Sequence, residues 1–406
     1  MNTTPKSLRL QIALFGRTNA GKSTFLNLAT GQDTAITSPV AGTTTDVVEK
    51  AMELLPLGPV LFLDTPGFGD TSELGGKRME RAGKVFDRAD AAVLLCLADT
   101  WGDEEEMLAE EIKKRRLPAV CVITQTDLVK PSAAFLEKLK EKGFATPVSS
   151  APGKREEVLN SFKSELLKVI PAERLADPPL LGDLLPANGT VLLIVPIDLQ
   201  APKGRLILPQ VQAIRDALDH EASVIVVREN NFLPMLANLK NPPDLVVCDS
   251  QIVKRMAAEI PPEIPCTTFS ILFARLKGDL KTLTEGAAAI QSLKPGDKVL
   301  IAEACTHHAA DDDIGRVKIP NGLQKYVGGT LQIDVCAGRD YPANLKEYKL
   351  IVHCGGCMFN RSEILSRLQA AKEAGVPITN YGVALSFVSG ALKQVLKPFP
   401  SVEKII

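Results

Sequence analysis

The stretch Gly16-Arg17-Thr18-Asn19-Ala20-Gly21-Lys22-Ser23 matches the phosphate-binding pattern G-x-x-x-x-G-K-S/T. It follows the apolar run Leu10–Phe15 directly, and Thr24–Leu28 can start a helix after it. In this order of strand, loop and helix, backbone N–H groups wrap a row of phosphates, Lys22 neutralises their outer oxygens and Ser23 holds Mg²⁺. The segment therefore predicts a nucleotide site at the following residues: Gly16, Asn19, Ala20, Gly21, Lys22, Ser23 and Thr24.

Short apolar runs alternate with amphipathic stretches on either side of this loop, from Leu8 to about Ile170. Strands that alternate with helices form right-handed crossovers, which predict a mostly parallel sheet covered on both faces. The predicted strands are Leu10–Phe15, Val60–Asp64, Ala91–Ala98, Ala119–Thr124 and Pro147–Ser150.

The chain has 406 residues, a length typical of two to four domains. Clusters of proline interrupt the alternation of strands and helices at two places. A linker is expected across Pro171–Thr190, and a second boundary at Pro261–Pro265. The predicted domains are residues 1–172, 180–264 and 267–406. The fold class is α/β, a P-loop domain followed by two smaller α/β domains with mostly parallel sheets.

The two smaller domains are expected to repeat the alternation. Predicted strands are Val191–Ile197, Ser223–Arg228, Leu245–Cys248, Lys298–Ala302, Leu331–Val335 and Tyr348–Val352, and predicted helices are Leu206–His220, Phe232–Leu239, Gly278–Leu293 and Ser362–Ala374. The middle domain carries no recognisable chemical constellation, so docking or dimerisation is its expected role.

Composition excludes several classes of protein. Lys and Arg total 47 against 48 Asp and Glu, a balance that argues against a nucleic-acid partner. The longest apolar stretches fall far short of the roughly 18 residues that a membrane-spanning helix needs, and Met1–Leu10 has no signal-peptide core. We expect a cytoplasmic protein without a membrane partner.

Two segments beyond the phosphate loop fit a nucleotide switch. Asp64-Thr65-Pro66-Gly67 closes a predicted strand with D-x-x-G, which places Asp64 to hold Mg²⁺ through water and Gly67 to sense the γ-phosphate. Gly42–Asp46 supplies hydroxyls between the two motifs, and Thr44 is the expected Mg²⁺ ligand. The expected catalytic residues are Lys22, Thr44, Asp64 and Gly67.

Together these motifs resemble the TrmE/Era-like GTPases over roughly residues 8–170. Such GTPases usually select guanine with N-K-x-D, where this chain has Thr124-Gln125-Thr126-Asp127. Asp127 keeps the carboxylate that accepts guanine N1–H and N2–H, and Ser150 and Ala151 resemble the usual S-A-K element. We expect GTP to be preferred, with an affinity loosened by the two replacements.

The resemblance also implies how GTP is hydrolysed. Phe68 stands where Ras-like proteins place the Gln that orients water, so turnover is expected to be slow. In the resembled class, an Asn at the position of Asn19 coordinates K⁺, which implies K⁺ stimulation here.

Cysteine and histidine concentrate in the last third of the chain. Seven of the twelve lie between Cys305 and Cys357, and five of these form C-x-H-x₄₅-H-C-x-x-C. Cys305 and Cys354 each follow a predicted strand, and residues just past parallel strands meet at one sheet edge. Three thiolates with imidazoles nearby suit either a structural Cys₃His zinc site or a [4Fe–4S] cluster with one exchangeable position, and spacing does not separate the two.

The combination of a P-loop GTPase domain, a plain α/β module and this cysteine pattern resembles the [FeFe]-hydrogenase maturation GTPase family HydF over nearly the whole chain. The resemblance implies a homodimer, or a higher oligomer, that receives a di-iron precursor from two radical-SAM maturases and delivers it to apo-[FeFe]-hydrogenase. It implies cluster ligands at Cys305, Cys354 and Cys357, with His307 and His353 as a labile fourth ligand or supporting donors.

Two other interpretations remain open from sequence. One is an RNA-associated GTPase of the TrmE/Era type with a structural zinc site. The other is a docking protein whose P-loop no longer binds nucleotide. The cofactors expected on the favoured interpretation are GTP, Mg²⁺, K⁺ and a [4Fe–4S] cluster.

Overall fold

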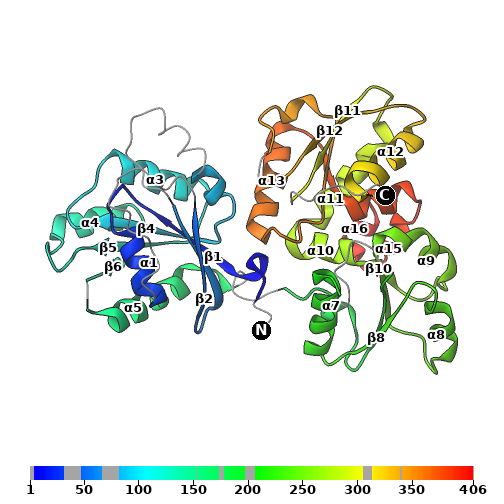
Figure 1. Ribbon diagram of the computed structural model, residues 1–406, viewed down its shortest axis with the longest axis horizontal. Helices are drawn as coiled ribbons and strands as arrows, with labels where there is room; N and C mark the ends of the chain where they lie inside the picture. The colour runs from blue at the N-terminus through cyan, green and yellow to red at the C-terminus, as the bar shows by residue number, and fades with distance from the viewer. Residues whose placement is uncertain are drawn as a thin grey trace. The chain divides into compact units, whose positions relative to one another are not determined.

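The computed structural model describes residues 4–31, 47–65, 82–151, 153–172, 178–196, 206–304, 313–338 and 341–405 (Figure 1). The chain divides into two units, Met1–Asp177 and Pro178–Ile406. Within the described residues no helix is both long and apolar enough to span a bilayer.

A six-stranded sheet forms the centre of the first unit, in the order β2-β3-β1-β4-β5-β6. Its strands are β1 (Leu10–Phe15), β2 (Val48–Leu54), β3 (Gly58–Asp64), β4 (Ala91–Leu97), β5 (Ala119–Thr124) and β6 (Val148–Ser149). All neighbours are parallel except β2, which is antiparallel to β3. The predicted α/β class with a mostly parallel sheet is confirmed.

Strand β2 is the strand of this sheet that the sequence analysis missed. It carries Glu49, Lys50 and Glu53 and lies at the edge, where one side needs no strand partner. Charged edge strands lack the continuous apolar run that marks the central strands of a parallel sheet.

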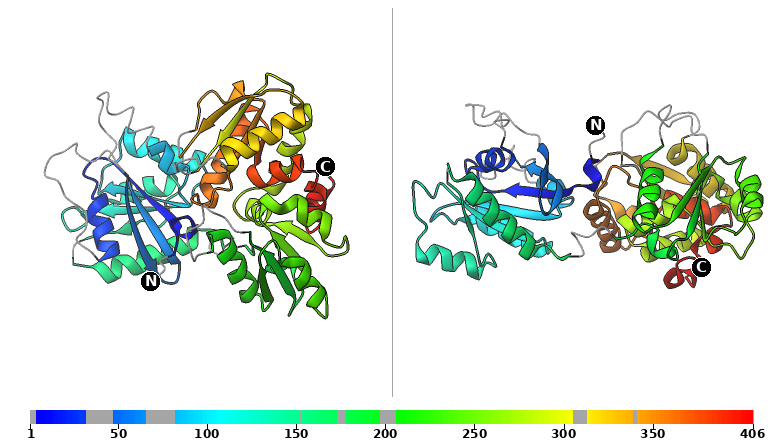
Figure 2. Two further views of the ribbon diagram at one scale, coloured as in Figure 1. Left: turned by 45° about the vertical axis from the view of Figure 1, so that its right-hand side comes forward. Right: turned by 90° about the horizontal axis from the view of Figure 1, so that it is seen from below.

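Helices cover both faces of this sheet, as Figures 1 and 2 show. Ile12 and Leu14 of β1 share one core with α1 (Lys22–Thr30) and α5 (Arg155–Val169). Alternate residues of the same strand belong to a second core on the opposite face, with α3 (Asp103–Lys114) and α4 (Ala133–Glu141). Burial of both faces explains why the central strands read as unbroken apolar runs.

The second unit holds two four-stranded parallel sheets, β10-β9-β7-β8 and β12-β11-β13-β14. Their strands are β7 (Thr190–Ile194), β8 (Ser223–Val227), β9 (Leu245–Cys248), β10 (Cys266–Thr268), β11 (Lys298–Ala302), β12 (Gln332–Cys336), β13 (Leu350–His353) and β14 (Ile378–Asn380). The accompanying helices are α7 (Leu208–Asp219), α8 (Phe232–Asn238), α9 (Val253–Glu259), α10 (Phe269–Lys277), α11 (Leu280–Ala288), α12 (Ile319–Val327), α13 (Arg361–Ala374), α14 (Tyr381–Val388), α15 (Leu392–Leu396) and α16 (Pro400–Glu403).

Strands β10 and β14 have only three residues each and were not predicted. A run this short carries no periodic signal that separates strand from helix. The sequence analysis set a domain boundary between residues 264 and 267. Strand β10 begins at Cys266 and pairs with β9, so the sheet β10-β9-β7-β8 includes residues on both sides of that boundary.

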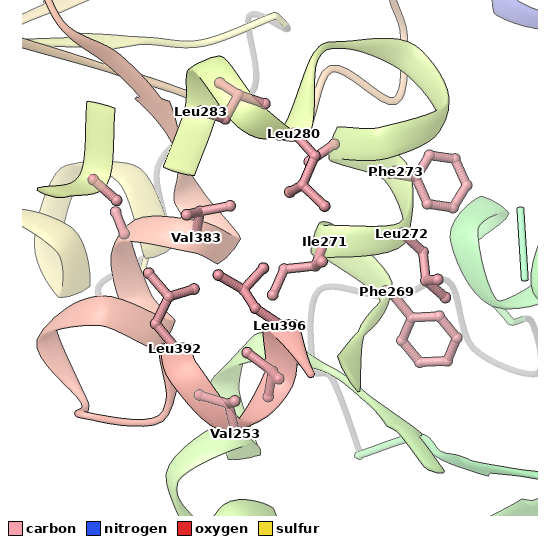
Figure 3. Packing of buried hydrophobic residues seen from close by; sticks show 14 of the residues in the cluster. Val253, Phe269, Ile271, Leu272, Phe273, Leu280, Leu283, Val383, Leu392 and Leu396 are labelled. Atoms are coloured by element: carbon pink, nitrogen blue, oxygen red, sulfur yellow. The ribbon is translucent and has the colours of Figure 1, made fainter. Parts of the chain in front are cut away.

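One hydrophobic core runs through both sheets of the second unit. Helix α10 lies within it, and Figure 3 shows its Ile271 next to Val383 of α14 and Leu396 of α15. The helix starts directly after β10, where Thr268 Oγ1 accepts the N–H of Ile271 at 3.2 Å. Helix α10 therefore joins the first sheet of this unit to the core of the second.

Helix α11 approaches β14 so closely that only glycine fits at position 286. A Cβ on Gly286 would lie 1.9 Å from the carbonyl oxygen of Ile378. We predict that Gly286→Ala destabilises the second unit by about 1–3 kcal/mol, the usual cost of overpacking. Gly322→Ala in α12 is the matched control, because its Cβ would meet nothing nearer than Val388 at 3.4 Å and alanine favours a helix.

Urea unfolding of the full chain checks this prediction with two probes. The single tryptophan, Trp101, reports on the first unit, whereas circular dichroism reports on both units. Gly286→Ala should move part of the circular-dichroism transition to lower urea and leave the fluorescence transition in place. Equal stability of the two glycine variants would contradict the close approach.

Candidate functional site

The phosphate loop connects β1 to α1 in a conformation that needs glycine at both ends. Gly21 precedes α1 with φ of +83°. A Cβ on Gly16 would lie 2.5 Å from the carbonyl oxygen of Leu95 in β4. Glycine therefore allows the loop to pass close to the sheet and present its N–H groups at the start of α1.

Lys22 and Ser23 lie where the loop turns into the helix. Lys22 is 7% exposed, and its Nζ donates to the carbonyl oxygens of Gly16 and Arg17 at 2.9 and 2.8 Å. Burial lowers the pKa of Lys22 to about 8, opposed by the nearby Asp64 carboxylate. A buried ammonium held over the loop is suited to phosphate oxygens.

Ser23 and Asp64 meet although they are far apart in sequence. Ser23 Oγ donates to Asp64 Oδ2 at 2.9 Å, and burial raises the pKa of Asp64 although this bond opposes the shift. The structure thus brings together two of the residues expected around Mg²⁺. Thr44 and Gly67, two of the four predicted catalytic residues, lie outside the described residues.

A cavity of about 640 Å³ opens beside the first turn of α1. Its walls include five of the residues predicted to bind nucleotide: Gly21, Thr24, Asp127, Ser150 and Ala151. The volume is typical of a small-molecule site.

Thr124, which stands where the usual pattern has Asn, contacts the phosphate loop. Its hydroxyl is buried and lies 2.9 Å from the carbonyl oxygen of Ala20 and 3.2 Å from that of Cys96. The end of β5 is thereby tied to the phosphate loop. Asp127 is exposed at the cavity, so its carboxylate is accessible to a base.

The sequence analysis missed an ion pair between the phosphate loop and helix α3. Arg17 Nε donates to Glu105 Oε1 at 2.6 Å, and a second contact joins Arg17 Nη2 to Oε2. The Glu105 side chain is fully buried and also accepts the N–H of Gly102 at 2.9 Å. The pair joins the loop to the start of α3. Eighty-eight positions separate its members, so no local pattern could reveal it.

The second candidate site lies at the carboxyl edge of the sheet that contains β11, β12 and β13. Ala302 pairs with Cys336 on one side and with His353 on the other. Cys354 N donates to the carbonyl oxygen of Ala302 at 2.8 Å. The register thus sets Cys354 beside the end of β11, as the sequence analysis expected of neighbouring parallel strands.

Backbone N–H groups converge on the sulfur of Cys354. Its Sγ accepts from Ala304 N at 3.0 Å and from Gly356 N at 3.4 Å. Gly356 has φ of +62°, and a Cβ there would lie 2.5 Å from Ile364. Two N–H donors on one sulfur stabilise a thiolate, so the donor set fits a thiolate-bound metal centre.

The remaining predicted ligands divide into described and undescribed positions. Cys357 is half-buried at the end of the same loop. Cys305 and His307 lie outside the described residues. Among the residues that are described, no group of three or more Cys, His, Asp or Glu side chains is gathered closely enough to hold a metal ion.

His353 is 4% exposed, and both of its ring nitrogens have partners. Nδ1 lies 2.6 Å from the carbonyl oxygen of Cys354, and Nε2 lies 3.0 Å from Nη1 of Arg367. Burial and the Arg367 charge lower the pKa of His353 to about 3. The ring is therefore neutral, with Nδ1–H donating to Cys354 and Nε2 accepting from Arg367.

Two buried cations near the cysteine loop were also missed by sequence analysis. Arg367 lies between the rings of Tyr341 and Phe359, with its guanidinium carbon 4.9 and 4.5 Å from their centroids. Lys277, the last residue of α10, donates to carbonyl oxygens of the loop. Neither residue belongs to the cysteine–histidine pattern, and only the fold brings them to it.

Comparison with known proteins shows that the unit with the phosphate loop is similar to GTPases. Residues 11–125 match the family model described as 50S ribosome-binding GTPase. The chain is 34% identical over 174 residues to the tRNA modification GTPase MnmE of Zymomonas mobilis, covering 39% of this chain and 37% of the relative. It is 34% identical over 142 residues to the GTPase Der of Persephonella marina, covering 34% of this chain and 32% of the relative.

The chain thus spans roughly a quarter to a third of the length of such curated relatives. Among solved structures, Era of Aquifex aeolicus bound to GDP and AlF4⁻ matches at 22% identity with a TM-score of 0.34. That match covers 54% of this chain and 94% of the Era chain.

The second unit matches two models of a different kind. Residues 180–278 match the hydrogen maturase F dimerization domain, and residues 281–398 match the hydrogen maturase F tetramerization domain. These two models cover more than half of the chain, and they follow the GTPase domain in sequence. The chain belongs to the hydrogen maturase F family.

Proposed function

We propose that this protein is a slow GTPase and a [4Fe–4S] scaffold, which receives a di-iron precursor from two radical-SAM maturases and delivers it to apo-[FeFe]-hydrogenase. The observation that carries the cluster assignment is the sulfur of Cys354, which accepts two backbone N–H groups at the sheet edge where β11 and β13 end. The family assignment supports the maturation role.

GTP would occupy the phosphate loop and the cavity beside α1. Lys22 would release its two loop carbonyls and bind β- and γ-phosphate oxygens, while Asp127 would accept the guanine N–H groups. Ser23 and Asp64 would hold Mg²⁺, which neutralises charge on the phosphates. Asn19 is proposed to bind K⁺, and Phe68 cannot orient water, so hydrolysis would be slow and stimulated by K⁺.

The cluster would be held by Cys305, Cys354 and Cys357. Three thiolates leave one iron with an exchangeable position, which is the chemistry that a carrier of cargo needs. His353 would not be a ligand in the conformation described, because both ring nitrogens are engaged. Its Nδ1–H would instead hold the main chain of Cys354, while His307 stays a candidate fourth ligand.

Association between copies would complete the scaffold. The dimerization and tetramerization domain matches support a homodimer that can form a higher oligomer. GTP would act as a conformational ligand, because its γ-phosphate would order segments Gly42–Asp46 and Asp64–Gly69 and alter contacts with partners.

Asp127→Asn tests the proposed base site. The amide would no longer accept both guanine N–H groups but suits xanthine, which has a carbonyl at C2. We expect GTP affinity to fall roughly 10- to 100-fold, the value of hydrogen bonds to a charged group, and xanthosine triphosphate to bind better than GTP. Titration with both nucleotides measures this. Glu137→Gln, an exposed change on α4, is the control, and unaltered GTP affinity in Asp127→Asn would contradict the assignment.

The lowered pKa of Lys22 predicts a pH dependence of GTP binding. In the free protein Lys22 is charged below its pKa of about 8 and increasingly neutral above it. The triphosphate selects the charged form, so binding takes up a proton above that pH and Kd should rise roughly tenfold per unit there. Measurements from about pH 7 to about pH 9.5 test this. Lys22→Arg should bind without this dependence because guanidinium does not titrate, and a flat wild-type profile would contradict the prediction.

Anaerobic reconstitution with iron and sulfide tests the cluster. Wild-type protein should gain about four iron atoms per chain, with iron–sulfur absorption and an EPR signal on reduction. Cys354→Ser and Cys357→Ser should lose most of that absorption. Cys336→Ser should keep it, because Cys336 ends β12 outside the ligand pattern. A colourless wild-type protein that contains one zinc would contradict the proposal.

A further inference from the structure

Lys277 places a buried ammonium directly against the cysteine loop. The residue is 4% exposed, and its Nζ donates to the carbonyl oxygens of Gly356, Cys357 and Phe359 at 3.2, 3.2 and 2.8 Å. All three N–H groups of an ammonium can be used in this way. One buried side chain therefore holds three carbonyl groups of the loop in place.

The carbonyl groups accept hydrogen bonds from the three N–H donors of Lys277, but they do not neutralise its positive charge. A buried cation is costly unless an anion lies near it. Burial lowers the pKa of Lys277 to about 8, and negative charge at the Cys357 and Cys354 sulfurs would oppose that shift. In the described parts of the chain, no ion pair joins Lys277 to a carboxylate. Thiolates that bind a metal centre at this loop would supply the compensating negative charge.

The position of this ammonium is fixed by the rest of the fold. Helix α10 is capped by Thr268 at its start, and Arg361 at the start of α13 donates to the carbonyl oxygens of Leu276 and Gly278 at its end. Asn360 caps α13 through Glu363 N at 3.2 Å, just after the loop. Lys277 and the loop are thus held by the same two helices.

The other buried cation near the loop has different duties. Arg367 donates to His353 Nε2 and to the carbonyl oxygen of Gly338 at 2.7 Å, and two aromatic rings enclose it. The Arg367 guanidinium contacts the histidine ring, whereas the Lys277 ammonium contacts the cysteine loop.

We propose that Lys277 is a positioning residue for the iron–sulfur cluster, which shapes the Cys354–Cys357 loop through three carbonyl contacts and supplies positive charge beside the cluster thiolates. This inference rests on the proposed function. A cluster bound by three thiolates becomes more negative when it is reduced, so a nearby ammonium favours the reduced state.

Lys277→Met tests the charge, because methionine has a similar length and no ammonium. In the full-length, anaerobically reconstituted protein, we expect reduction to become about tenfold less favourable, which is about 59 mV for a one-electron couple. Lys277→Arg should stay near the wild-type potential because it keeps the charge. Lys281→Met removes an exposed lysine four positions away and should leave the potential unchanged.

Hydrogen exchange of the metal-free protein tests the positioning role independently of iron. Backbone amides across residues 354–359 should exchange faster in Lys277→Met than in Lys281→Met, because the carbonyl contacts are lost. If Lys277→Met is folded by circular dichroism but takes up no iron, while Lys277→Arg does, the role is also supported.

Two results would overturn the inference and can be told apart from failure of the proposed function. Wild-type protein that takes up no iron refutes the cluster and this inference together. Wild-type protein that takes up iron, with Lys277→Met at the wild-type potential and exchange rate, refutes only the role of Lys277.

Discussion

The parallel register of β11 and β13 is the constraint on which the account of the second unit depends. It sets Ala302 opposite His353, so the chain leaves both strands at one edge and the Ala304 N–H reaches the sulfur of Cys354. A shift by one residue would turn His353 out of the core and separate these groups. Buried apolar side chains on both faces of these strands hold the register.

Around this edge the protein surrounds sulfur with donors and positive charge. Backbone N–H groups donate to the Cys354 sulfur, Lys277 binds carbonyl groups of the loop, and burial together with the Arg367 charge keeps His353 neutral. Each of these groups stabilises negative charge at the cysteines or fixes the main chain that carries them. The phosphate loop follows the same principle, with N–H groups and Lys22 arranged for an anion.

The sequence analysis predicted the features that local patterns encode. Continuous apolar runs revealed β1, β5, β9 and β11, and strand adjacency placed Cys354 beside the end of β11. Cys96 and Cys248 lie inside such apolar runs and are buried. Strands of three residues and the charged edge strand β2 lacked a periodic signal, so they were missed.

Local patterns could not predict contacts between residues that are far apart in the sequence. Lys277 lies about eighty positions before the loop that it binds, and Arg17 pairs with Glu105 across another long separation. A lysine at the end of a helix is ordinarily exposed, and only tertiary packing buries this one. The contact of Thr124 with Ala20 in the phosphate loop was not predicted for the same reason, because the two residues are far apart in sequence.

Diffraction from crystals of the iron-reconstituted protein, recorded on both sides of the iron absorption edge, tests the central claim most directly. The account predicts iron anomalous density at bonding distance from the sulfurs of Cys305, Cys354 and Cys357, with His353 still bound to Arg367. Iron density away from Cys354, or zinc density in its place, would contradict it.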